Sequence, residues 1–202
     1  MSISISYIIE TAGIVVFTIS GAFSAMQKRF DAFGVLIIGF VTALGGGTIR
    51  DVLIGYTPVT WMRTPNIPIL IFATGIVTLF FKNHIKNLKT TFIIFDAVGL
   101  GLYTMIGIQK GIQAGLDPGI CIILGTITGS FGGVLRDILL NDIPQIFRKE
   151  IYATACIVGG VIYFILLESL NRDVARLVTI SLICGIRLIA VRFNLSMPKF
   201  YA

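Results

Sequence analysis

Charged residues are scarce in this sequence: Asp, Glu, Lys and Arg make up 13% of its 202 residues, against about 25% in a soluble domain. With 55% hydrophobic residues and a mean hydropathy of +0.93, the chain has too little polar surface to coat a water-soluble globule. The net charge is +6, but the basic residues are scattered between apolar runs and form no stripe that would bind nucleic acid. The composition predicts an integral membrane protein.

Metal ligands and catalytic groups are equally few. The cysteines Cys121, Cys156 and Cys184 lie inside apolar runs without CxxC or Cys/His spacing, and the single histidine, His84, lies in a basic segment. These residues are typical of small buried side chains and of a solvated loop. The sequence also has no nucleophile–base pair and no phosphate-binding loop with a lysine. We therefore expect no enzyme, no cofactor and no metal beyond permeant ions.

Seven apolar stretches are long enough to cross a bilayer core, which takes about 20 mainly apolar residues per helix. Turn residues and charges separate them, such as Asp117-Pro118 and Asn171-Arg172-Asp173. The sequence thus predicts an all-α membrane domain over residues 1–202, in a bacterial inner (plasma) membrane. Its predicted transmembrane helices are 7–27, 33–55, 65–81, 91–110, 117–140, 150–168 and 174–194.

Lys and Arg flank these predicted spans unevenly, and such a bias sets the orientation of a membrane protein. One side carries nine of the 16 basic residues and the other carries four. Because the cytoplasmic side is the richer one, we expect the N-terminus outside and the C-terminus in the cytoplasm. The nine are Lys28, Arg29, Lys82, Lys86, Lys89, Arg148, Lys149, Arg192 and Lys199.

The chain contains an internal repeat: adding 86 to the residue number maps residues 10–58 onto the second half without a gap. Residues 1–86 and 87–172 each hold three predicted spans, so the second copy has to enter the membrane from the opposite side. The result is an inverted 3+3 repeat, which is typical of transporters and pores, followed by a seventh helix and tail in 173–202. Identical pairs include Gly13/Gly99, Thr18/Thr104, Gly21/Gly107, Asp31/Asp117, Gly39/Gly125, Arg50/Arg136, Asp51/Asp137 and Pro58/Pro144.

The most specific local pattern is a glycine run followed by Arg-Asp, present once in each copy. It spans residues 43–51 and 129–137, inside the second span of each repeat. Adjacent glycines weaken a helix by about 1 kcal/mol each relative to Ala, so a kink or break that shapes a water-lined pathway is one interpretation. The four-residue spacing of Gly39, Ala43 and Gly47 equally fits close helix packing.

Arg50 and Arg136 lie inside predicted spans, where a charge costs at least about 2.5–3.5 kcal/mol. Glu10 and Asp96, also separated by 86, lie at matching depths. We expect Glu10–Arg50 and Asp96–Arg136 to form symmetric ion pairs or water-bridged gates. Asp51 and Asp137 project about 100° away from their arginines on the helix and are candidates to meet Arg187 instead. Purely structural bridges are the alternative.

The two Gly-Gly-x-x-Arg-Asp segments, at 46–51 and 132–137, and the inverted repeat resemble the prokaryotic branch of the trimeric intracellular cation (TRIC) channel family, also described as glycine transporters. The resemblance implies a homotrimer with an hourglass pore in each subunit, lined by the second and fifth spans and permeable to K⁺ and Na⁺. It assigns pore glycines at Gly45, Gly46, Gly47, Gly132 and Gly133. Phe131 replaces glycine in the second copy, where it is a candidate apolar constriction.

Two arginines in a cation pathway require compensation. We expect it from the carboxylates of Glu10, Asp51, Asp96 and Asp137, or from freed carbonyls together with Thr42, Thr48, Thr128 and Ser130. Three functions stay open at this point. They are a cation channel, a secondary transporter of a small zwitterion such as glycine, and a non-transporting membrane protein whose glycines serve packing alone.

Overall fold

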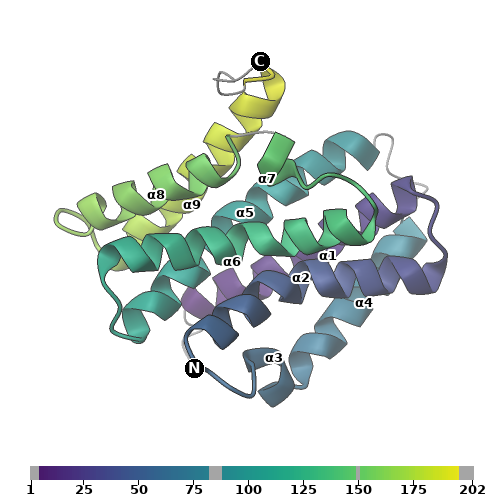
Figure 1. Ribbon diagram of the computed structural model, residues 1–202, viewed down its shortest axis with the longest axis horizontal. Coiled ribbons are helices and arrows are strands. Elements are labelled where there is room, and N and C mark those ends of the chain that lie inside the picture. The colour runs from purple at the N-terminus through teal and green to yellow at the C-terminus, as the bar shows by residue number, and fades with distance from the viewer. Residues whose placement is uncertain (1–4, 82–87, 149–150, 196–202) are drawn as a thin grey trace.

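The computed structural model describes residues 5–81, 88–148 and 151–195. Within these residues the chain is helical and contains no strand (Figure 1). The helices are α1 (Ile5–Gln27), α2 (Ala32–Leu53), α3 (Thr60–Arg63), α4 (Asn66–Phe81), α5 (Leu88–Gln113), α6 (Pro118–Leu139), α7 (Gln145–Arg148), α8 (Ala153–Leu166) and α9 (Arg172–Arg192).

Five helices, α1, α2, α5, α6 and α9, are long and apolar enough to cross a membrane. The helices α4 and α8 are apolar but have only 16 and 14 residues, or about 24 and 21 Å of helix. Each follows a four-residue helix, α3 or α7, which sequence reasoning did not predict. All seven predicted spans thus correspond to helices, and the third and sixth are shorter than a bilayer core.

The boundaries of α2 and α6 coincide after adding 86, and the two helices begin with different signals. Asp31 caps α2 by accepting a hydrogen bond from the Gly34 amide at 2.7 Å, while Pro118 follows Asp117 at the first turn of α6, where a missing amide proton costs nothing. After each helix the chain turns through a left-handed residue, Gly55 or Asn141. The repeat in the sequence therefore corresponds to a repeat in local structure.

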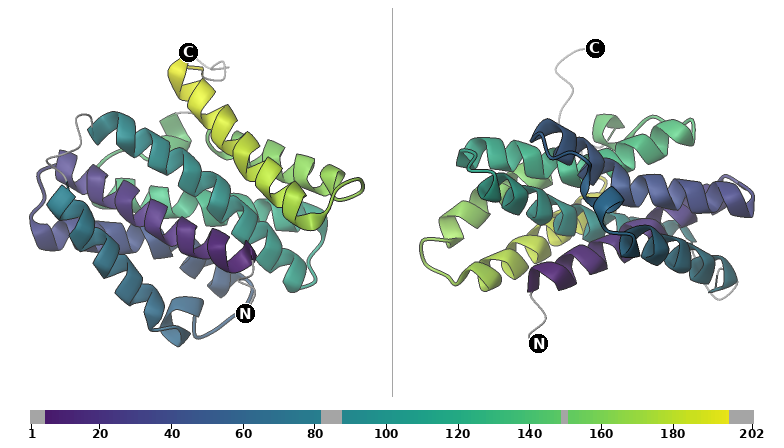
Figure 2. Two further views of the ribbon diagram at one scale, coloured as in Figure 1. Left: turned by 180° about the vertical axis from the view of Figure 1, so that it is seen from behind. Right: turned by 90° about the horizontal axis from the view of Figure 1, so that it is seen from below.

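Helices α1, α2, α5 and α6 form the centre of the molecule, each packed against two of the others. Helix α4 packs on α1 and α2, whereas α8 and α9 pack on α6 and α5. Figure 2 shows these peripheral helices on opposite flanks of the central four. The orientation predicted from the distribution of Lys and Arg depends partly on Lys82, Lys86, Lys149 and Lys199. These four residues lie outside the described residues, and so does His84.

The central crossing of α2 and α6 depends on glycine. A Cβ added to Gly46 would collide with the carbonyl oxygen of Thr128, and one added to Gly132 would collide with the carbonyl oxygen of Thr42. These two contacts are related by the same offset of 86. Because backbone meets backbone there, neither side can move aside to accept a methyl group.

Replacing Gly132 by Ala should therefore destabilise the protein, by about 1–3 kcal/mol as in overpacked cores. Thermal unfolding in detergent measures the change. Gly119→Ala is the matched control, since Gly119 lies on the same helix with open space around its Cα and should be neutral or slightly stabilised. Equal unfolding midpoints for the two variants would contradict the role of the crossing.

Candidate functional site

Each repeat buries an arginine that binds the aspartate next to it in the chain. Arg50 donates from Nε and Nη2 to Asp51 Oδ1 at 2.9 and 2.7 Å, and Arg136 donates from Nε to Asp137 Oδ1 at 2.8 Å. Arg50 is 3% exposed and Arg136 is fully buried. The pairs lie in the last turns of α2 and α6, so the two helices carry equivalent charged ends.

The second oxygen of each aspartate caps the following short helix. Asp51 Oδ2 accepts the Thr60 amide at 2.8 Å, at the start of α3, and Asp137 Oδ2 accepts the Gln145 amide at 3.0 Å, at the start of α7. A carboxylate is favoured at a helix N-terminus. Each Arg-Asp dipeptide therefore fixes the chain that follows it, which explains why α3 and α7 form where the sequence showed no helical period.

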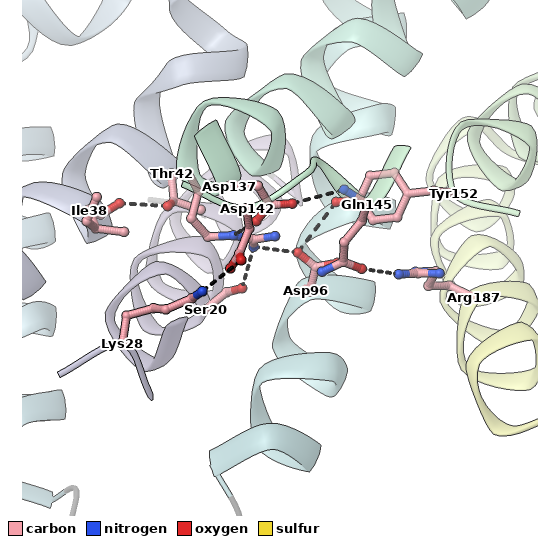
Figure 3. Close-up of polar contacts among 11 residues, drawn as sticks. Ser20, Lys28, Ile38, Thr42, Asp96, Asp137, Asp142, Gln145, Tyr152 and Arg187 are labelled. Carbon is pink, nitrogen blue, oxygen red and sulfur yellow. Dashed lines mark hydrogen bonds and ion pairs between the residues drawn. The ribbon is translucent and has the colours of Figure 1, made fainter. Parts of the chain in front are cut away.

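Arg136 also reaches helices α1 and α5. Its Nη1 donates to Asp96 Oδ1 at 2.7 Å and to Ser20 Oγ at 3.2 Å, so the predicted Asp96–Arg136 pair is present. Tyr152 joins by donating its hydroxyl to Asp96 at 3.4 Å (Figure 3). Asp96 Oδ2 and Arg136 Nη2 are buried without a hydrogen-bond partner among the described residues, and water is the usual partner of such atoms.

The first repeat departs from this arrangement, because Glu10 forms no ion pair with Arg50 among the described residues. The predicted symmetric ion pair is therefore wrong in its direct form. Both side chains instead line a cavity of about 30 Å³ beside α3, together with Gly47, Thr48 and Asp51. We call it the α3-side cavity. It has room for one or two waters, so a water bridge between Glu10 and Arg50 fits.

Tyr103, which sequence reasoning missed, lines the α3-side cavity, and Phe17, also missed, packs against Tyr103. Their rings stack at a centroid distance of 4.7 Å, and the Tyr103 hydroxyl donates to the Ala43 carbonyl at 2.6 Å. The two residues are themselves separated by 86. A search for similar residues separated by 86, and not only for identical ones, would have found Phe17 and Tyr103.

A second cavity, of about 340 Å³, lies beside α7 at the other end of α1 and reaches Asp137, Ser24, Gln145 and Arg187. We call it the α7-side cavity. Ile14 lines the first cavity and Ser24 the second, which places the two about 15 Å apart along α1. The Phe17–Tyr103 stack and the α2–α6 crossing lie between them.

Arg187 does not meet Asp51 or Asp137, contrary to one of our predictions. It donates to the side-chain oxygen of Gln145 and its guanidinium lies 4.6 Å from the centre of the Tyr152 ring (Figure 3). The aspartates are already bound by the neighbouring arginines, which is possible because a long arginine side chain can fold back along its own helix. Arg187 therefore ties α9 to the α7 segment.

The glycine runs do not break their helices. α2 and α6 continue without interruption through Gly45–Gly47 and Gly132–Gly133, so the predicted break with freed carbonyls is wrong. The hydroxyls of Thr42, Thr128 and Ser130 donate within their own helices, as does Thr48. Of these four, only Thr48 lines the cavities described above, and it also accepts from the Trp61 indole at 3.2 Å.

Phe131, the candidate constriction, is half-buried and lines neither cavity. Its counterpart Gly45 lies instead in the interface of the two helices, where an added Cβ would meet Leu135 at 2.7 Å. The role of Phe131 as an apolar constriction stays a prediction.

These features define a helical membrane protein in which the Arg-Asp dipeptide of each repeat lies at a cavity, Arg50 and Asp51 at the α3-side cavity and Asp137 at the α7-side cavity. A family model described as "Glycine transporter" matches residues 7–83 and 93–168, once in each half, with starting points separated by the same 86 residues. The chain belongs to this family, the prokaryotic branch of the TRIC channels.

Related proteins extend over nearly the whole chain. The UPF0126 inner membrane protein YadS of Escherichia coli is 39% identical over 197 residues, which cover 96% of this chain and 95% of YadS. A TRIC channel orthologue from Rhodobacter sphaeroides superposes with a TM-score of 0.89 at 33% identity, covering 95% of this chain and 99% of its own. A prokaryotic TRIC channel solved in 0.5 M KCl gives 0.88 at 32% identity, covering 96% and 98%.

The Asp96–Arg136 pair should show strong energetic coupling. Removing one partner of a buried pair costs about 3–5 kcal/mol, since it strands the other charge. In a double-mutant cycle of Asp96→Asn and Arg136→Gln, followed by thermal or denaturant unfolding, we expect coupling of about 1–3 kcal/mol. The Glu10→Gln and Arg50→Gln cycle is the internal comparison and should couple more weakly. Additive effects at Asp96 and Arg136 would rule out the pair.

Proposed function

We propose that this protein is a monovalent cation channel that conducts K⁺ and Na⁺ through a pore inside each subunit of a homotrimer. In this proposal, seven helices cross a bacterial inner membrane. Residues 1–86 and 87–172 form two inverted repeats, and residues 173–202 hold the seventh helix and the tail. The N-terminus lies outside and the C-terminus in the cytoplasm, as the distribution of Lys and Arg favours.

The observation that carries this proposal is the charge of the two sites. Each combines one arginine with two carboxylates: Arg50 with Asp51 and Glu10, and Arg136 with Asp137 and Asp96. The formal charge of each three-residue set is therefore −1, in spite of its arginine. The carboxylates at these two sites favour cations over anions, and they have to outweigh Lys28, Lys89 and Arg187, which also line the α7-side cavity.

The pathway of the proposal joins the α3-side and α7-side cavities through the crossing of α2 and α6. Gly45, Gly46, Gly47, Gly132 and Gly133 line or shape it, and Phe131 lies beside it. We infer that the Phe17–Tyr103 stack, with ring centroids 4.7 Å apart, closes it. Opening requires these rings or the crossing helices to move apart, so that water fills the connection.

The solved neighbours support this function, since they are TRIC cation channels covering nearly the whole chain at 32–36% identity. The family description supports the second candidate, transport of a zwitterion such as glycine. The α3-side cavity, with its carboxylates and arginine, is the place for such a substrate. Its volume of about 30 Å³ is that of one or two waters, however, which is too small for glycine without rearrangement.

Recording purified protein in a planar bilayer under an asymmetric KCl gradient tests the proposal. Discrete current steps that reverse near the K⁺ equilibrium potential are expected. Saturable glycine counterflow in liposomes without current steps would instead establish the transporter. Silence in both assays would leave neither function standing.

Phe17→Ala should increase the conductance or the open time, because it removes one ring of the stack that separates the cavities. Phe23→Ala is the matched control. Phe23 is buried on the same helix but packs edge-on against Phe95, with centroids 6.1 Å apart, and takes no part in the Phe17–Tyr103 stack. The same recordings report both variants, and an equal response would show that the stack does not close the path.

A further inference from the structure

A third cavity, of about 170 Å³, lies outside the proposed pathway, between the C-terminal end of α5, α8 and the start of α9. Gln109 and Gln113 line it from α5, and Arg172 and Arg176 line it from α9. It shares no lining residue with the α3-side cavity. We call it the α9 cavity.

Two hydrogen-bond donors in the α9 cavity lack an acceptor within the part of the chain that the structure describes. Gln109 is 9% exposed, and its Nε2 is buried without an acceptor. Nε of Arg176 is also buried without an acceptor. Burying an unpaired donor costs about 1–3 kcal/mol. Two such donors in one cavity indicate a binding site for a ligand with acceptor oxygens.

The charge of the α9 cavity is positive. Arg176 donates from Nη1 to Asp173 at 2.9 Å and to Ser6 at 3.2 Å, which fixes its guanidinium and leaves Nε free. Arg172 contributes a second guanidinium from the first residue of α9, and a helix N-terminus adds about half a positive charge. Arginines at such a terminus suit a phosphate group, whose oxygens accept several bonds at once.

The position of the cavity points to the membrane interface. Gln113 is the last residue of α5 and Arg172 the first of α9, so the cavity lies at the level where the helices end. Ile112 forms an apolar part of the lining and is 42% exposed. An apolar rim around a basic centre matches a headgroup with its acyl chains alongside.

We propose that the α9 cavity binds a phosphate-bearing anion, held by the guanidinium groups of Arg172 and Arg176 and by the Gln109 amide. Two sources share this chemistry, the phosphodiester of an anionic phospholipid and inorganic phosphate. The site is independent of the proposed channel and would exist equally in a transporter.

Thermal unfolding of the purified full chain in neutral detergent tests this site. The probes are sodium phosphate, at ionic strength held constant with chloride, and dioctanoyl phosphatidylglycerol, with dioctanoylglycerol as the analogue that lacks phosphate. A saturable rise in the midpoint with either phosphate compound, and none with dioctanoylglycerol, is expected. A rise with both probes identifies a free-phosphate site, and a rise with the lipid alone identifies a headgroup site.

Arg172→Gln and Arg176→Gln should each weaken the apparent affinity roughly tenfold, as expected for one charge-assisted contact. Arg172 is exposed, so Arg172→Gln should keep the fold. It therefore tests the site even if Arg176→Gln disturbs α9 by removing the Arg176 hydrogen bonds. Lys110→Gln is the matched control: it removes a cation from the same end of α5, outside the cavity lining. The proposal fails if neither probe stabilises the wild type, or if Arg172→Gln and Lys110→Gln bind alike.

Discussion

The structure depends on the compensation of two arginines buried in an apolar helical bundle. A lone charge at that depth is costly, and each guanidinium here is bound by the aspartate that follows it in the chain. That aspartate has a second oxygen, which caps α3 or α7. The short helices precede α4 and α8 in the chain. One ionic contact in each repeat therefore fixes the end of one long helix and the entry of the next.

Departures from the repeat are as informative as the repeat itself. Where the second copy has a shorter aspartate, Asp96, it contacts Arg136 directly; where the first has Glu10, a cavity with room for water takes the place of the contact. Phe17 becomes Tyr103, and the added hydroxyl bonds to the Ala43 carbonyl. The two halves thus share a framework but differ in hydration, so the two ends of the proposed pathway are not equivalent.

Apolar length and the offset of 86 were enough to predict the seven main helices, and the matching depth of two charged residues was enough to predict the Asp96–Arg136 pair. The same reasoning failed where tertiary contacts decide. α3 and α7 depend on capping by Asp51 and Asp137, and a four-residue helix has no period to detect. The glycine spacing left a kink or break and close helix packing both open, because the contact of Gly46 with Thr128 involves a helix distant in sequence that helix propensity does not report.

A pathway from the α3-side cavity to the α7-side cavity is the central claim, and Thr48→Cys tests it most directly. Thr48 lines the α3-side cavity, and the native cysteines Cys121, Cys156 and Cys184 are first replaced by serine. In bilayer recordings, a cationic methanethiosulfonate reagent added to one compartment should reduce the K⁺ current, because it attaches a bulky positive group to the thiol introduced in the pathway. Unchanged current from protein that mass spectrometry finds fully modified would contradict the account.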